Sequence, residues 1–111
     1  MGSIVQVSEK DLPWLEYDGA PPGHVRVKPI TPRGSEAPPV QYVTYAAGHS
    51  DRTHSHDEAE VFFITAGAVT VDGVVSGPGS VIYIPPGVEY AMVGGDEGVT
   101  FFRIVVSSPV S

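Results

Sequence analysis

The chain contains no cysteine among its 111 residues. Disulfides, thiolate zinc sites and cysteine nucleophiles are therefore excluded, and a transition metal would have to be bound by His, carboxylate, Tyr or water. Basic residues are scarce as well, with 6 Lys and Arg against 13 Asp and Glu and a net charge of −7. Because nucleic-acid affinity rests on neutralising phosphates, this balance argues against a nucleic-acid partner.

Long apolar runs are also missing. No run approaches the roughly 18 residues that a membrane-spanning helix needs, so we expect no membrane partner. The stretch MGSIVQVSEKD at the N-terminus has neither a basic start nor a long apolar segment, which argues against a signal peptide. We therefore expect a cytoplasmic protein, and the length of 111 residues predicts a single domain over 1–111.

What the sequence does contain is typical of β structure. It has 13 Gly and 11 Pro, and apolar residues almost never recur at the 3.6-residue period of a helix. Short runs rich in Val, Ile, Tyr and Phe are separated by turn residues, which favours a sandwich or barrel. The clearest turn is Asp72-Gly73 in TVDGVV, a strong signal for a two-residue hairpin. The runs are IVQV, HVRVKPI, VQYVTYA, EVFFIT, AVTV, SVIYI, EYAMV and VTFFRIVV.

Three of the four histidines lie within GHSDRTHSHDEAEVFFITAG, residues 48–67. His54 and His56 would share one face of a strand with their Cα atoms about 7 Å apart, close enough for two imidazoles to converge on one ion. On a straight strand Glu60 would lie about 20 Å from His54, so a shared ion requires the chain to turn at 57–59. The alternative is a solvated polar loop.

From Glu60 onward the sequence alternates, with Glu60, Phe62 and Ile64 on one face of the expected strand. A carboxylate in line with apolar residues needs a partner if it is buried. Arg103, in the otherwise apolar run TFFRIVV, needs a partner for the same reason, so we expect it to pair with an acid or to reach a cavity.

The stretch 48–67 resembles the first motif of the cupins, which is Gly, five residues, HxH, three residues, Glu, six residues, Gly. The matching positions are Gly48, His54, His56, Glu60 and Gly67.

The stretch GSVIYIPPGVEYAMVG, 79–94, resembles the second cupin motif. Gly79, Pro85 and Gly87 match, but Tyr90 stands where the family has its fourth ligand, a His, and Gly94 stands where it has Asn. The resemblance implies an all-β cupin double-stranded β-helix, a jelly-roll barrel. It also implies that His54, His56 and Glu60 bind one metal ion.

A set of two His and one carboxylate with open positions is the pattern of non-heme Fe(II) oxygenases, so Fe(II) is the favoured ion. Zn²⁺ with a bound water is also compatible, and Mn²⁺ is possible. Tyr90 could be a phenolate ligand, a hydrogen-bonding acid or base near the ion, or an aromatic wall of the barrel. Phe62, Met92 and Arg103 are candidates for the substrate pocket, whereas His24 and His49 are expected to be surface residues.

Three functions remain open. The first is a metal-dependent oxygenase or dioxygenase acting on a small organic substrate. The second is a divalent-metal isomerase, cyclase or lyase with Tyr90 as acid or base. The third is a non-catalytic sensor of a metal or small ligand. Cupins are commonly dimeric, so a homodimer is expected, with the early strands around IVQV pairing with the second subunit.

Overall fold

The computed structural model describes residues 2–106, which form one antiparallel β sheet with a single 3-10 turn. The predicted all-β class is confirmed. The elements are the 3-10 turn Glu9–Asp11 and the strands β1 (Leu15–Glu16), β2 (Val25–Pro29), β3 (Val40–Tyr45), β4 (Ala59–Val71), β5 (Val74–Ser76), β6 (Val81–Ile84) and β7 (Met92–Val106).

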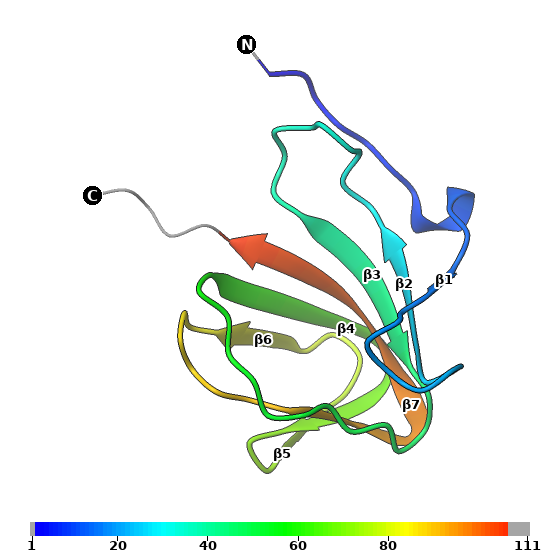
Figure 1. Cartoon of the computed structure of the whole chain (residues 1–111), viewed down its shortest axis with the longest axis vertical. Helices are drawn as coiled ribbons and strands as arrows, with labels where there is room; N and C mark the ends of the chain where they lie inside the picture. Colours follow the sequence, from blue (N-terminus) through cyan, green and yellow to red (C-terminus); the bar gives the residue numbers. More distant parts are fainter. Residues whose placement is uncertain (1, 107–111) are drawn as a thin grey trace.

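The strands follow the order β1-β2-β3-β7-β4-β5, and β6 pairs with residues 60–63 of β4 on the edge opposite β7 (Figure 1). Between β3 and β4 the chain crosses the open side of the curved sheet, as the green segment of Figure 1 shows. Backbone hydrogen bonds tie this segment, 49–56, to residues 87–94. The strands and this crossing segment enclose the interior in the manner of a jelly roll.

The hairpin predicted at Asp72-Gly73 is confirmed. Val71 pairs with Val74, and the two turn residues have φ values of 50° and 76°. The runs EVFFIT and AVTV, expected as separate strands, instead form the single long strand β4, whose pairing with β7 shifts register near Gly67. Gly67 has φ 72°, and a Cβ there would lie 2.2 Å from the carbonyl oxygen of Gly98, so only glycine fits this close approach.

The interior is apolar, and its largest fully buried side chains include Phe62, Phe101, Ile64 and Met92. The predicted alternation along β4 holds: Glu60, Phe62 and Ile64 are buried, whereas Phe63 between them faces solvent. The rings of Phe62 and Phe101 meet edge to face at 5.4 Å, across paired strands β4 and β7.

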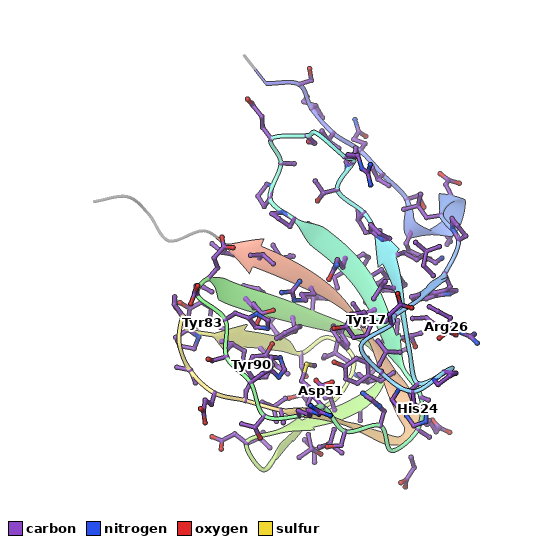
Figure 2. The ribbon with its side chains drawn as sticks, in the orientation of Figure 1. Tyr17, His24, Arg26, Asp51, Tyr83 and Tyr90 are labelled. Carbon is purple, nitrogen blue, oxygen red and sulfur yellow. The ribbon has the colours of Figure 1, made fainter. Side chains whose placement is uncertain are left out.

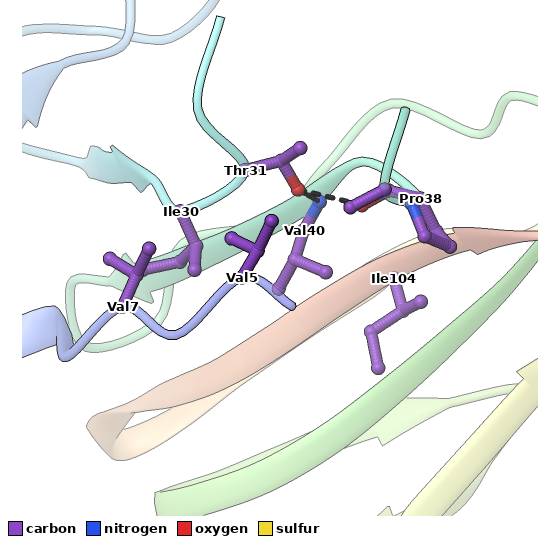
Figure 3. Close-up of a pocket in the computed structure, with 8 residues that line it drawn as sticks. Val5, Val7, Ile30, Thr31, Pro38, Val40 and Ile104 are labelled. Atoms are coloured by element: carbon purple, nitrogen blue, oxygen red, sulfur yellow. Dashed lines mark hydrogen bonds between the residues drawn. The ribbon is translucent and has the colours of Figure 1, made fainter. Parts of the chain in front are cut away.

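The run IVQV does not form a strand, so that expectation is wrong for the described chain. Val5 and Val7 lie instead over Ile30, Val40 and Ile104, where they line a small apolar pocket (Figure 3). Among the described residues there is also no helix long and apolar enough to cross a membrane.

Candidate functional site

A cavity of about 640 Å³, larger than the pocket beneath Val5 and Val7, opens between the curved sheet and the crossing segment 49–56. The lower part of Figure 2 shows Tyr90 and Asp51, two residues of its wall, between these layers. The wall combines apolar side chains with a few polar groups, which is the usual make-up of a small-molecule site. The candidates predicted from the sequence that line it are His54, His56, Phe62, Tyr90, Met92 and Arg103.

The smaller cavity, of about 270 Å³, is the pocket beneath Val5 and Val7. Among the described residues that line it, only Thr31 has a polar side chain, and the hydroxyl of Thr31 is held between the carbonyl of Pro38 and the N–H of Val40 (Figure 3). These lining residues include no group suited to acid, base or metal chemistry.

Glu60 is the buried carboxylate at the edge of the larger cavity, with an exposed fraction of only 1%. Its two oxygens face different donors. The hydroxyl of Tyr90 donates to Oε1 over 2.6 Å, and Nε of Arg103 donates to Oε2. Arg103 also donates from Nη1 to Oε1 of Gln41 over 3.0 Å. A buried carboxylate with a cationic partner and two hydrogen bonds meets the requirement for burying charge.

Arg103 does both things expected of it, because it pairs with an acid and lines the cavity. Arg103 lies on β7, the strand next to β4, and pairs with Phe62. Phe62 is two residues along β4 from Glu60, on the same face. Gln41 is opposite Arg103 on β3. Gln41 was not predicted from the sequence, because nothing in the run VQYVTYA distinguishes it from an ordinary strand residue.

His54 and His56 approach Glu60 from the crossing segment. His54 forms an isolated bridge with Tyr90 through two backbone hydrogen bonds of 2.8 and 3.0 Å, and the carbonyl of His56 accepts from the N–H of Gly87 over 2.8 Å. The two histidines therefore do not lie on the regular strand that was predicted. The chain then turns at 57–58 and enters β4 at Ala59, as a site shared with Glu60 requires. Nδ1 of His54 lies 2.7 Å from the carbonyl oxygen of Arg52. This contact favours the tautomer with Nδ1 protonated, which leaves the Nε2 lone pair free.

The spacing of these donors can be compared with that around an ion. Two ligand atoms bound at about 2.1 Å stand about 3.0–3.4 Å apart, and two imidazole centroids about 4.5–5.3 Å apart. Nε2 of His56 lies 3.6 Å from Oε1 of Glu60. The ring centroids of His54 and His56 are 4.9 Å apart.

These residues fit a divalent ion in donor type and in approximate spacing. They have not converged on one point, since no three His, Asp or Glu side chains within residues 2–106 stand close enough together to hold an ion as placed. Nor is any buried polar side-chain atom of that part of the chain left without a partner. Binding would therefore draw the two imidazoles and Oε1 inward, with Arg103 and Tyr90 still orienting the carboxylate.

Tyr90 lies against the candidate ligands, with its ring centroid 4.6 Å from that of His54. Burial, followed by the hydrogen bond to Glu60 and the negative charge of Glu60, raises the pKa of the Tyr90 phenol well above its usual value. The hydroxyl is thus protonated at neutral pH, with its proton directed at Glu60. A buried carboxylate is a strong acceptor, so the proton is directed at Glu60.

His49 and Asp51 also belong to the cavity wall, although His49 was expected at the surface. His49 is 9% exposed, and its Nε2 lies 3.4 Å from Oδ1 of Asp51. Asp51 accepts a hydrogen bond of 2.7 Å from the hydroxyl of Tyr45. Burial and the nearby Asp51 carboxylate raise the pKa of Tyr45. The available signal was the position of His49 and Asp51 inside the first motif.

Comparisons with known proteins agree with this architecture. The family described as the ChrR cupin-like domain matches residues 3–108. No curated protein matches the chain. Similar solved structures include an RmlC-like cupin from Ralstonia eutropha, with TM-score 0.81 and 17% identity over 96% of this chain and 70% of that one.

Two further structures are titled as named proteins. KdgF from Halomonas sp. has TM-score 0.78 and 12% identity, with 96% of each chain covered. The polyketide cyclase RemF from Streptomyces resistomycificus has TM-score 0.73 and 17% identity over 98% of this chain and 88% of that one. At such low identity these likenesses establish the shared fold and nothing finer.

Proposed function

The chain belongs to the ChrR cupin-like family, and from this premise we propose that it is a metal-dependent enzyme acting on a small organic molecule. The observation that carries the proposal is the approach of two imidazoles in the cavity wall to the buried Glu60 carboxylate beside it. His54, His56 and Glu60 would hold the ion. Fe(II) is favoured, with Zn²⁺ and Mn²⁺ as the other candidates.

When bound, the ion would supply open coordination positions for a substrate or O₂ and would polarise the bound group as a Lewis acid. The side chains around it have defined tasks. The carbonyl of Arg52 orients the ring of His54, while Arg103 and Tyr90 orient Glu60 through one oxygen each.

The rest of the wall determines what can enter. Phe62 and Met92 provide apolar surface that excludes water from the reacting group. The guanidinium of Arg103 donates from Nε to Glu60 and from Nη1 to Gln41. These two hydrogen bonds fix the guanidinium plane at the cavity wall. A compact substrate with an apolar body and one or two polar oxygens suits these contacts.

Oxidative cleavage by an Fe(II) oxygenase is the leading reaction class, because a two-His, one-carboxylate set leaves positions open for both substrate and O₂. Acid–base chemistry by an isomerase, cyclase or lyase is the second class, and the Tyr90–Glu60 hydrogen bond favours it. The Tyr90 oxygen can accept a proton from a substrate while its own proton passes to Oε1 of Glu60. O₂ consumption in the Fe(II)-loaded protein separates the two classes.

Metal analysis tests the site before any substrate is known. Protein purified from cells supplied with iron and zinc should contain about one ion per chain at this site. His54→Ala, His56→Ala and Glu60→Gln should each lower that content sharply, whereas Asp57→Asn, an exposed acid of the same loop, should leave it unchanged. A metal-free wild type, or equal metal in all four variants, would contradict the proposal. A wild type that binds metal without turnover of any candidate substrate class would favour the sensor.

A further inference from the structure

A second pair of histidines meets at the rim of the larger cavity, outside the site formed by Glu60. Nδ1 of His24 and Nδ1 of His49 are only 3.2 Å apart, and their rings stand edge to face with centroids 5.3 Å apart. His24 is exposed and His49 is buried. Figure 2 shows His24 and Asp51, the neighbour of His49, at the same end of the molecule.

We propose that His24 and His49 form a second divalent-metal site, which binds Zn²⁺, Cu²⁺ or Ni²⁺ through the two Nδ1 atoms. Two nitrogens bound at about 2.0–2.1 Å, at angles between octahedral and tetrahedral, stand about 2.9–3.4 Å apart. The observed 3.2 Å lies within that range. Without an ion, one imidazole N–H donates to the lone pair of the other, and the ion takes the place of that proton.

The buried ligand is already oriented. Nε2 of His49 faces Oδ1 of Asp51 at 3.4 Å, and Oδ2 of Asp51 accepts from the hydroxyl of Tyr45. These contacts resemble the carboxylate–histidine–metal arrangement, in which an outer carboxylate orients the ligating ring. The ring of Tyr45 also packs edge to face on His49, with centroids 4.9 Å apart.

The backbone holds both ligands at this spacing. His24 immediately precedes β2, and its carbonyl accepts a hydrogen bond of 2.8 Å from the N–H of Ala46 at the end of β3. The N–H of His49 donates to the carbonyl of Ala46 over 3.1 Å. Two ligands anchored to one residue of the sheet lose little freedom when an ion binds, which favours binding.

The donor set defines the ligand class. Two imidazoles favour borderline transition ions over Mg²⁺ or Ca²⁺, which prefer oxygen. Within the described residues, no third His, Asp or Glu completes the pair into a closed set of ligands. Water or an exogenous ligand therefore takes the remaining positions, and the exposed side of His24 is the entry path.

The experiment starts from the double variant His54→Ala/His56→Ala. The chain has four histidines, so this variant retains His24 and His49 alone, and both imidazoles can be assigned directly by ¹⁵N NMR. Titration with Zn²⁺ should bind one ion per chain and shift both Nδ1 resonances, while Nε2 stays protonated. Zn²⁺ binding that leaves either Nδ1 resonance unmoved, or no binding at all, would overturn the proposal.

Further variants identify the supporting residues in calorimetric titrations with Zn²⁺. His24→Gln and His49→Gln should each weaken binding at least 10-fold, and Asp51→Asn should weaken it about 10- to 100-fold. Asp96→Asn, an exposed acid on β7, is the matched control and should change nothing. If the double variant fails to fold, His24→Gln in the otherwise native chain should lower the Zn²⁺ stoichiometry by one ion. An unchanged stoichiometry there refutes the pair.

Discussion

Replacing Arg103 with methionine tests how the buried Glu60 is stabilised. The side chain of Glu60 is 1% exposed and that of Arg103 is 24% exposed, so the substitution removes a cation from a carboxylate that water does not reach. Breaking a buried ion pair in this way costs about 3–5 kcal/mol. Glu60 keeps the hydrogen bond from Tyr90, and Arg103 is partly solvated, so we expect a loss of about 2–3 kcal/mol of unfolding free energy.

The assay is urea denaturation together with thermal unfolding, both after treatment with a chelator. At about 4–6 °C per kcal/mol for a domain of this size, Tm should fall by about 10–15 °C. The matched control is Arg26→Met, which removes the exposed pair with Glu16, whose side chains are 52% and 48% exposed. That variant should lose less than about 1 kcal/mol.

Metal addition extends the test. An ion on Glu60 supplies the positive charge that Arg103→Met removes, so saturating Zn²⁺ should stabilise the variant more than the wild type. At 100 times the dissociation constant the linkage is about 2.7 kcal/mol, enough to recover most of the loss. If Arg103→Met costs less than about 0.5 kcal/mol, the buried-pair reasoning is wrong. If Zn²⁺ stabilises both proteins equally, the bound ion does not contact Glu60.

Tyr90→Phe should retain its bound metal, as measured by elemental analysis, and lower activity about 10²- to 10⁴-fold. In urea denaturation it should lose about 1–2 kcal/mol of unfolding free energy. Loss of the metal would instead identify Tyr90 as a ligand. The raised pKa values of Tyr45 and Tyr90 keep both phenols protonated in the fold, so their contribution to stability is present below the ordinary value of 10.0 and is lost as the pH rises above it. Denaturation at pH 8 and above pH 10 checks the sign, and equal stabilities would contradict it. Gly67→Ala should destabilise far more than Gly79→Ala in thermal melts, because a Cβ on residue 67 would lie 2.2 Å from a backbone oxygen. Gly79 faces open space, so its substitution adds only the backbone strain of φ +87°. Similar losses of stability in the two variants would contradict the clash at residue 67. Sedimentation at micromolar concentration should give a dimer mass that falls to a monomer when residues 2–8 are removed, and a monomeric full chain would refute the pairing of this segment.

Much of the fold could be read from local sequence patterns. The hairpin at Asp72-Gly73 was predictable because a two-residue turn with positive φ restricts the residues that can occupy it. The inward face of Glu60, Phe62 and Ile64 was predictable because side chains alternate along any strand. The joining of EVFFIT and AVTV into β4 was not, because it depends on the register shift where the backbone of Gly67 meets that of Gly98.

The candidate site divides in the same way. The sequence by itself predicted that His54, His56 and Glu60 lie near one another, because the chain was expected to turn at 57–59, and the structure places them close together. Only the tertiary structure decided what surrounds Glu60: Tyr90 is 30 residues away and Arg103 is 43 residues away, and closure of the barrel brings them to opposite oxygens of one carboxylate. Local patterns specify which face of a strand a side chain occupies, whereas contacts across a barrel depend on strand order, register and curvature, which the whole chain sets together.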